Sequence, residues 1–184
     1  TATLPGAVWP TGTREIMGLL QQGLVDLAFI GGAEIDRHGN LKTSYVGDWR
    51  RPRVRLPASG GGGDIAALSK RFVVIMPQEK HRFRERVDFI TSPGFGSGTG
   101  WRQRVGLPGG GPAAVITTLA VFRFEPDTAE MVLASYHPGQ SVDRVREATG
   151  WALRVAPGVR ETPIPTDEEI AIVRASDPLG FWTR

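Results

Sequence analysis

Residues 59–64 of this chain, with the sequence SGGGGD, have the composition of a site built from backbone rather than side chains. Glycines let a backbone approach a ligand closely. N–H groups that immediately precede a helix stabilise an oxyanion or a phosphate. The segment therefore predicts a backbone-lined acyl or phosphate site, with a flexible surface loop as the alternative. The candidate site residues are Ser59, Gly60, Gly61, Gly62 and Gly63.

Three familiar nucleotide-binding or catalytic motifs are absent from the chain. The glycine run is not a Walker loop, because no Gly-Lys-Ser or Gly-Lys-Thr follows it, and it is not a G-x-G-x-x-G dinucleotide motif. A serine nucleophile is also unsupported, since Ser97 lies in a Gly-Ser-Gly sequence that falls short of Gly-x-Ser-x-Gly. The segment therefore predicts backbone chemistry without a recognised nucleophile beside it.

Glu34 and Asp36 form a pair of carboxylates two residues apart along the chain. Glu34 follows Gly31 and Gly32 at the end of an apolar run, where a covalent carboxylate nucleophile can lie. The two carboxylates alternate along a predicted strand, which favours a structural role for Asp36 and leaves both roles open for Glu34. For Asp36 we expect hydrogen bonds to the turn at residues 38–40, because Asp and Asn commonly bind backbone groups in turns.

Histidine and cysteine usage argues against a metal site. No pair among His38, His81 and His137 has metal-ligand spacing, and each is predicted to be structural or on the surface. The chain contains no cysteine, which excludes disulfides, thiolate catalysis and cysteine-ligated metals. We therefore expect no metal and no bound cofactor, and a composition without cysteine fits a cytoplasmic protein or a heat-adapted one.

The formal net charge is +3, and the basic residues gather in two clusters. Such clusters either lie on a solvated or partner-facing surface, or attract a ligand that carries phosphates. Nucleic acid is not expected as a partner, because no nucleic-acid motif accompanies them. A membrane is not expected either, because no stretch approaches the roughly 20 apolar residues of a membrane helix. The first cluster is Arg50, Arg51, Arg53 and Arg55; the second is Lys80, Arg82, Arg84 and Arg86.

The elements that must position these residues alternate between helix and strand in the first half of the chain. Residues 11–22 predict a short helix with Thr13 as a possible cap, and Gly23 ends it. Residues 25–30 predict a buried, parallel-type strand. Turn and short strands follow at residues 35–46, then an irregular loop at 47–63, a helix at 64–70, and strands at 72–76 and 87–91.

The second half predicts more strands and two capped helices. Residues 94–112 form a long ordered loop, and the last two of three strands at 114–118, 120–125 and 130–136 form a hairpin. Ser141 caps a helix that reaches Thr149, and a strand follows at 151–155. A capping box at residues 166–169 opens a helix through Ala175. The 184 residues predict a single α/β domain, an open mixed sheet with flanking helices.

Several segments together resemble a known family. The chain is similar to the β subunit of a family I coenzyme A (CoA) transferase, most of all the glutaconate CoA-transferase type. The resemblance extends from about Trp9 to Pro178. The segments that carry it are FIGGAEID at 29–36 with Gly39 and Asn40, residues 44–48 with Pro52, residues 59–66, EKHRF at 79–83, DFITSPG at 88–94, RQRVGLP at 102–108, and the turn at 149–150.

The resemblance implies a fold, a reaction and a partner. The fold is the CoA-transferase (NagB/RpiA-like) α/β fold, and the partner is an α subunit in a hetero-oligomer. A glutamate carboxylate attacks an acyl-CoA thioester to give an anhydride, and the CoA thiolate returns to give a glutamyl-CoA thioester. The acceptor carboxylate then takes the CoA, so CoA thioesters and carboxylic acids are substrates. The oxyanion and CoA-binding role falls to Ser59 and to the glycines at 60–63.

One departure from the family pattern concerns the nucleophile. The family glutamate lies in a Glu-Ser-Gly or Glu-Asn-Gly motif upstream of the region that matches Thr1, and these 184 residues contain neither motif. No catalytic residue is therefore assignable, since Glu34 falls where relatives can carry glutamine. We expect a chain that lacks its N-terminal part, or a short variant. The alternative functions are a ring-opening CoA-thioester hydrolase on the same scaffold and a non-catalytic assembly subunit.

Overall fold

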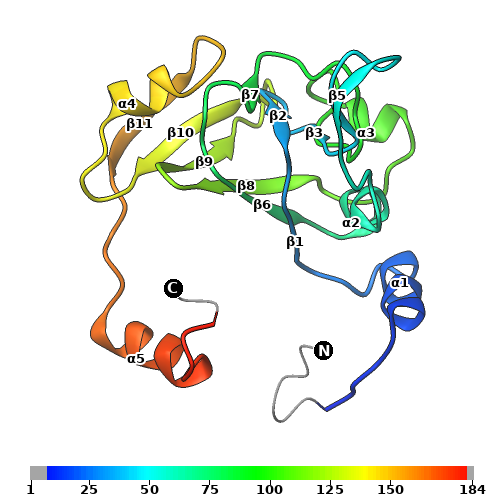
Figure 1. Ribbon diagram of the computed structural model, residues 1–184, viewed down its shortest axis with the longest axis horizontal. Helices are drawn as coiled ribbons and strands as arrows, with labels where there is room; N and C mark the ends of the chain where they lie inside the picture. Colours follow the sequence, from blue (N-terminus) through cyan, green and yellow to red (C-terminus); the bar gives the residue numbers. More distant parts are fainter. Residues whose placement is uncertain (1–7, 182–184) are drawn as a thin grey trace.

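The structure is a computed structural model that describes residues 8–181, and a six-stranded mixed sheet organises it (Figure 1). Strands β1, β6 and β8 run parallel, β9 is antiparallel to β8 and to β10, and β11 is parallel to β10. In spatial order the strands are β1 (Ala28–Ile30), β6 (Phe72–Met76), β8 (Pro112–Thr117), β9 (Ala120–Phe124), β10 (Met131–Tyr136) and β11 (Arg154–Glu161). The predicted mixed α/β sheet is confirmed.

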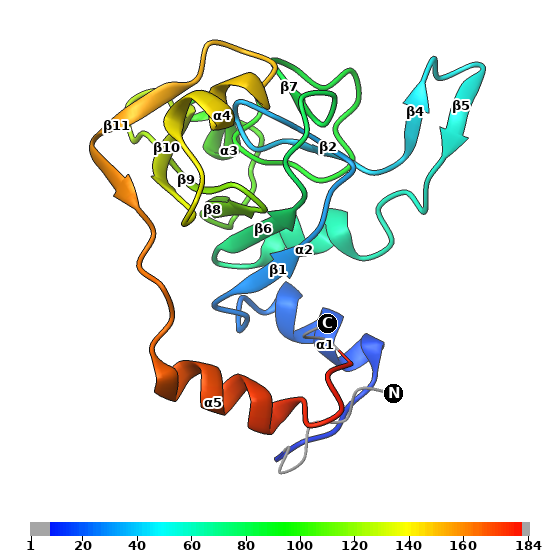
Figure 2. The same ribbon diagram turned by 60° about the vertical axis from the view of Figure 1, so that its left-hand side comes forward.

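Two small sheets accompany the large one. The first contains β3 (Leu41–Lys42), β2 (Glu34–Asp36) and β7 (Phe83–Arg84), in that order. The second is a hairpin of β4 (Tyr45–Gly47) and β5 (Pro52–Arg55), which projects from the rest of the molecule (Figure 2). Its strand β5 lies within residues 47–63, which the sequence predicts as an irregular loop.

Five helices are described. They are α1 (Thr13–Gln21), α2 (Gly62–Leu68), α3 (Trp101–Arg104), α4 (Val142–Glu147) and α5 (Asp167–Ser176). The predicted caps of the last two are confirmed, because the Ser141 side chain accepts from the backbone of Arg144 and Thr166 forms a capping box with Glu169. An extended segment joins β11 to α5, which lies away from the large sheet (Figures 1 and 2).

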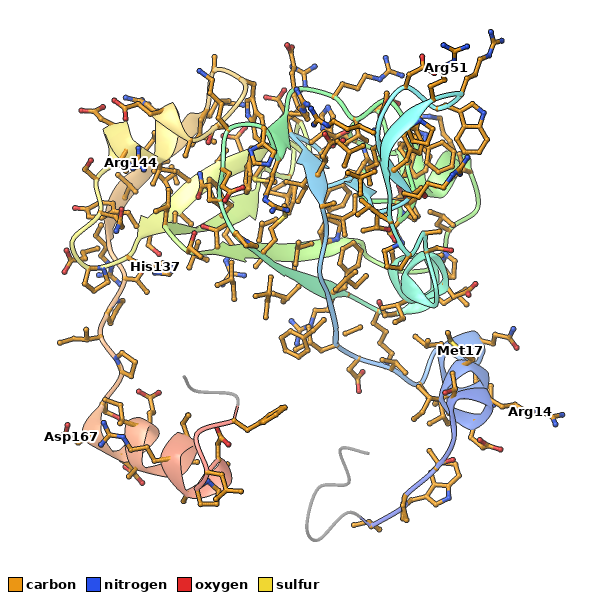
Figure 3. All side chains as sticks on the ribbon, in the orientation of Figure 1. Arg14, Met17, Arg51, His137, Arg144 and Asp167 are labelled. Carbon is orange, nitrogen blue, oxygen red and sulfur yellow. The ribbon has the colours of Figure 1, made fainter. Side chains whose placement is uncertain are left out.

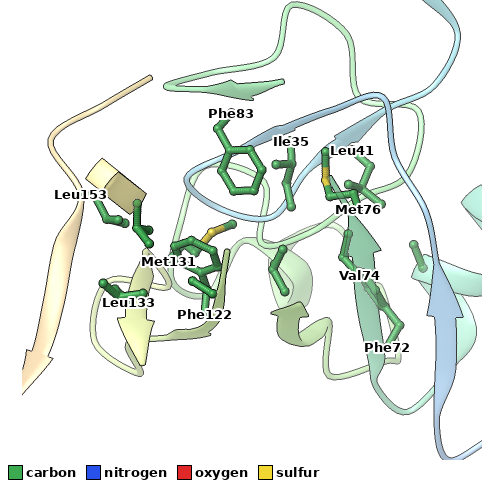
Figure 4. Packing of buried hydrophobic residues seen from close by; sticks show 14 residues of the cluster. Ile35, Leu41, Phe72, Val74, Met76, Phe83, Phe122, Met131, Leu133 and Leu153 are labelled. Atoms are coloured by element: carbon green, nitrogen blue, oxygen red, sulfur yellow. The ribbon is translucent and has the colours of Figure 1, made fainter. Parts of the chain in front are cut away.

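The core occupies one face of the large sheet. Phe72, Val74 and Met76 alternate along β6 and are buried there, together with Val115 of β8 and Phe122 of β9. The small β3–β2–β7 sheet covers them with three fully buried side chains, Ile35, Leu41 and Phe83 (Figure 4).

The opposite face of the large sheet is apolar and more open. Side chains alternate between faces of a strand, so Phe29 of β1 and Ile75 of β6 point away from the core. They are 61% and 53% exposed. The sequences FVVIM in β6 and PAAVIT in β8 are apolar at positions of both faces, which is typical of strands covered on two sides.

Several predicted elements differ from the structure. Residues 87–91 form no strand; they make separate bonds instead, including Thr91 N–H to the carbonyl of Leu41 in β3 and Val87 N–H to Asp36 in β2. The strand at 25–30 is shorter and lies at the sheet edge, so its central Phe29 is exposed rather than buried. Gly12, not Thr13, is the N-cap of α1, and the last predicted strand begins at Arg154.

Candidate functional site

The glycine segment, residues 59–63, forms a tight turn that becomes the first turn of α2. The backbone N–H of Gly62 donates to the carbonyl of Ser59 at 2.6 Å, and Gly61 is the N-cap. Gly60 has φ +47°, a left-handed conformation that favours glycine. Gly62 and Gly63 therefore belong to the helix itself, whereas the sequence predicts the helix to begin at residue 64.

The glycine segment contains backbone donors without an acceptor, and one of its glycines borders open space. Within the described part of the chain, the N–H groups of Gly60, Gly61 and Gly63 have no hydrogen-bond acceptor. A Cβ placed on Gly60 would meet nothing within 4 Å. One on Gly62 would lie 3.1 Å from Ser92 Oγ and 3.9 Å from Ile30 Cγ2, which places the segment at the carboxyl end of β1. Ligands of open α/β sheets commonly bind at this end of the strands.

Thr91 and Ser92 belong to the loop that packs beside the glycine segment. Thr91 Oγ1 accepts from the backbone of Thr43 at 2.9 Å and bonds to Ser44 Oγ at 2.8 Å. Its carbonyl would lie 3.4 Å from a Cβ on Gly63, and the neighbouring Ser92 is 1% exposed beside Gly62. The strand predicted at residues 87–91 is thus a supporting loop, and its threonine and the serine after it were not singled out from the sequence.

Glu34 belongs to a buried ion cluster and not to the glycine segment. Its Oε1 accepts from Arg84 Nε and Nη2, both at 3.3 Å, and its Oε2 lies 3.3 Å from Lys42 Nζ. Lys42 Nζ also pairs with Asp88 at 2.6 Å and lies 4.0 Å above the ring of Tyr45. Burial alone would lower the pKa of Lys42, but the bonds and charges of Asp88 and Glu34 outweigh it and raise that pKa. With both oxygens engaged, Glu34 acts as a structural anion.

Asp36 and Asn40 organise the turn that the sequence predicts at residues 38–40. Asp36 Oδ1 accepts from the backbone of His38 at 3.0 Å and of Asn40 at 3.1 Å. Asn40 Oδ1 accepts from the backbone of Gly94 and of Gly96, both at 3.0 Å, which ties the turn to the next loop. Burial raises the pKa of Asp36, and the hydrogen bonds that its carboxylate accepts oppose the rise. The expected turn role of Asp36 is confirmed.

The histidines make structural or surface contacts. His38 Nδ1 lies 3.0 Å from the carbonyl of Ala129, His137 Nε2 lies 2.9 Å from that of Thr117, and His81 pairs with Glu79 at the surface. Among the described residues, no group of three or more histidine, cysteine or acidic side chains is placed to hold a metal ion. Over the same residues, no helix has the length and apolar character needed to cross a membrane.

A cavity of about 930 Å³ lies elsewhere, between β2, β7 and α3. Its lining includes His38, Arg84, Arg86 and Trp101, together with the acids Asp88 and Glu85, and none of residues 59–63. The charges of both signs in its wall do not select an anion. The cavity and the glycine segment are therefore separate features.

Arg102 anchors α2 and was not identified as important from the sequence. Its side chain is 3% exposed and donates only to backbone carbonyls: Nε to Gly109 at 2.8 Å, Nη1 to Gly94 at 3.0 Å, and Nη2 to Ala66 at 2.9 Å and Ala67 at 3.2 Å. Burial lowers its pKa. The last two acceptors lie in the C-terminal half of α2, so this cation fixes the helix that begins at the glycine segment.

An open mixed α/β sheet with unpaired backbone donors at a strand end is an arrangement that can hold an anionic or acyl ligand. Comparison with known proteins narrows the class of protein. The family model described as Coenzyme A transferase matches residues 7–148. The chain therefore belongs to the coenzyme A transferase family.

Individual relatives agree with this assignment. The chain is 43% identical over 169 residues to the B subunit of 3-oxoadipate CoA-transferase from Pseudomonas knackmussii, and 39% identical over 173 residues to the B subunit of glutaconate CoA-transferase from Acidaminococcus fermentans. These matches cover 91% and 92% of this chain and 64% of each relative, so the chain spans less than two thirds of their length. The crystal structure of glutaconate coenzyme A-transferase from A. fermentans superimposes with a TM-score of 0.85 at 35% identity, covering 97% of this chain and 70% of that one.

Proposed function

We propose that this chain is part of the β subunit of a CoA-transferase, which moves CoA between an acyl-CoA and a carboxylic acid through a glutamyl-CoA thioester. The observation that carries the proposal is the family match over residues 7–148 together with 43% identity to a named transferase subunit. The glutamate nucleophile is expected outside these 184 residues, in the Glu-Ser-Gly or Glu-Asn-Gly motif of the family. The described chain supplies the scaffold around it.

The glycine segment is the part of this chain that we assign to the reaction. Attack on a thioester puts negative charge on its carbonyl oxygen, and preorganised backbone donors stabilise that charge without reorganising. The N–H groups of Gly60, Gly61 and Gly63 are unpaired in the described chain, and the space beside Gly60 is open. Ser59 accepts from Gly62 through its carbonyl and thereby shapes the turn. The segment thus supports a role in holding the acyl oxygen.

The substrates and the partner follow from the named relatives. Both relatives are B subunits of CoA-transferases, and each name contains a dicarboxylate, 3-oxoadipate or glutaconate. We accordingly assign a dicarboxylic acyl-CoA as the substrate class, CoA thioester as substrate rather than resident cofactor, and an α subunit as the partner. A cytoplasmic location fits these substrates.

Transfer and trapping test the proposal. The protein is produced from its complete gene with its companion subunit and given an acyl-CoA and a dicarboxylic acid. Mass spectrometry should detect the new acyl-CoA, and borohydride or hydroxylamine added with acyl-CoA should modify one glutamate. Turnover to free acid and CoA without any modified glutamate would instead assign the protein to CoA-thioester hydrolysis through water.

A further inference from the structure

The β4–β5 hairpin carries an exposed aromatic surface. Trp49 is 60% exposed and Phe89 is 44% exposed, and their rings stack with centroids 6.4 Å apart and planes inclined by 13°. Tyr45 is buried beneath them, with its ring centroid 5.6 Å from that of Trp49 and 6.0 Å from that of Phe89. The stack is therefore supported from below and leaves ring surface available to a ligand.

Arginines share this side of the hairpin. Tyr45 pairs with Arg55 across the two strands, so these two side chains lie on the same face. Arg53 lies two residues before Arg55, at a bulge where the register of the hairpin shifts. Arg50 and Arg51 lie in the connecting turn, and Arg51 points outward at its tip (Figure 3). We call Trp49, Phe89, Arg50, Arg51, Arg53 and Arg55 the hairpin face.

The positive charge of the hairpin face is uncompensated. Within the described chain, none of its arginines has a carboxylate oxygen within 4.0 Å. The nearby Asp48 uses Oδ1 to accept from the backbone of Arg50 at 2.7 Å and of Arg51 at 3.2 Å. In the second basic cluster, by contrast, two of the four cations are paired, Arg82 with Glu79 and Arg84 with Glu34. Guanidinium groups without a counter-charge favour a phosphate ligand.

The hairpin face is joined rigidly to the glycine segment. The backbone of Leu56 donates to Ser44 at 3.1 Å, that of Ala58 donates to Thr43 at 3.0 Å, and Thr43 Oγ1 donates back to Ala58 at 2.8 Å. Arg55 and Gly60 are close along the chain, and an extended chain of about five residues spans at most about 18 Å. One elongated ligand can therefore contact both places.

We propose that the hairpin face binds the nucleotide end of the CoA thioester, with the adenine on Trp49 and the phosphates on Arg53 and Arg55, while the acyl end lies on the glycine segment. The inference rests on the proposed function. A stacked ring recognises any aromatic base, and arginines recognise phosphate, so this face matches a ligand that carries both. The competing occupant is a surface of the companion subunit, which the experiment separates.

Binding of three probes tests the inference. CoA, adenosine 3′,5′-bisphosphate and pantetheine are titrated calorimetrically into the protein assembled with its companion subunit. Trp49→Ala should weaken the first two on the order of tenfold, as expected for loss of one stacked base. Arg53→Gln with Arg55→Gln should weaken them by at least about tenfold, as expected for lost charge-assisted hydrogen bonds. Trp49→Phe should restore most of the affinity, and pantetheine binding should not change.

Kinetics supply a second readout. In both variants KM for acyl-CoA should rise with kcat nearly unchanged, because the nucleotide end binds equally in the ground and transition states. Transfer from an acyl-pantetheine donor should be unaffected. Arg144→Gln with Arg146→Gln is the matched control, since these exposed arginines lie on α4, far from Arg51 in Figure 3.

Three results would overturn the inference. One is wild-type affinity for CoA and the bisphosphate in both variants. Another is an equal loss with acyl-pantetheine. The third is dissociation of the companion subunit in sedimentation velocity with nucleotide affinity retained, which would make the hairpin face a subunit contact. In each case wild-type transfer persists, so the proposed function stands; a wild type that neither binds CoA nor transfers it overturns both.

Discussion

At the scale of single residues, Gly60 tests whether the glycine segment faces the substrate. Gly60 and Gly106 both have positive φ, +47° and +74°, and a Cβ on either meets nothing within 4 Å. Alanine at each position should therefore cost a similar free energy of unfolding, about 1 kcal/mol. Only Gly60→Ala places a methyl group where we assign the acyl group, so it should lower kcat/KM by about 100-fold.

Gly106→Ala separates the effect of backbone strain from the effect of a methyl group placed against the substrate. Steady-state transfer assays and urea unfolding are run on both proteins, with Gly106→Ala as the control for backbone strain. Equal activity of the two variants would show that the glycine segment does not contact the substrate, and the family assignment would still hold.

The raised pKa values of Tyr45 and Lys42 predict that the protein loses stability at alkaline pH. Burial, followed by the charge of Asp88, raises the pKa of Tyr45 above 10.0, and the pKa of Lys42 lies above 10.5. Both groups therefore hold their protons more tightly in the folded state. Their contribution to stability is complete below about pH 10 and is lost as the pH rises through the folded pKa values.

Urea unfolding across this pH range measures the effect. Tyr45→Phe should flatten the alkaline decline, because the phenol no longer titrates, whereas Tyr136→Phe serves as the control outside the ion cluster. If the free energy of unfolding of Tyr45→Phe falls with rising pH as steeply as that of the wild type, titration of Tyr45 is not a source of the alkaline loss of stability.

At the scale of elements, Arg102 determines how firmly α2 is held. Lysine at this position retains the charge but loses the planar set of donors that reaches the carbonyls of Gly109, Gly94 and Ala66. Buried acceptors left unsatisfied should make Arg102→Lys less stable by about 2–4 kcal/mol. Amide hydrogens of α2 should exchange faster in this variant.

Arg104→Lys is the control within the same helix, because Arg104 is exposed and donates only to the carbonyl of Thr99, at 3.2 Å. It should change the free energy of unfolding by less than about 0.5 kcal/mol. Hydrogen exchange by mass spectrometry locates the effect, and unchanged protection of α2 in Arg102→Lys would show that other contacts fix the helix.

At the scale of the whole molecule, the open apolar face of the large sheet predicts self-association of the 184-residue chain. Phe29 and Ile75 are large, exposed and on the same face, and exposed apolar patches of this kind mark surfaces that other polypeptide covers. Phe29→Ser with Ile75→Thr should raise the concentration needed for association on the order of tenfold.

Sedimentation velocity over a concentration series measures this association. Val105→Thr is the control, because Val105 is 50% exposed at the end of α3 rather than on the sheet. Association that responds equally to both changes would show that the sheet face is not the contact.

Local patterns were sufficient for much of the fold. The run FVVIM, the hairpin of residues 120–136 and the two capped helices were predictable because period, turn residues and capping chemistry are properties of a few neighbouring residues. The errors arose where distant residues decide. Residues 87–91 have a strand-like sequence, yet the pairing at this segment is limited to one isolated bridge between Ser92 and Leu41, so no strand forms.

The sequence by itself determined the family and the glycine segment, because the segment's composition and the matching motifs depend only on the order of residues. The tertiary structure decided which charged side chains are paired and which are free to bind a ligand. Glu34 became a structural anion because β3 and β7 bring Lys42 and Arg84 to it. The two basic clusters, similar as sequences, differ because folding gives carboxylate partners to Arg82 and Arg84 and gives none within the described chain to the hairpin face. Burial and pairing are long-range properties, and only the assembled chain defines them.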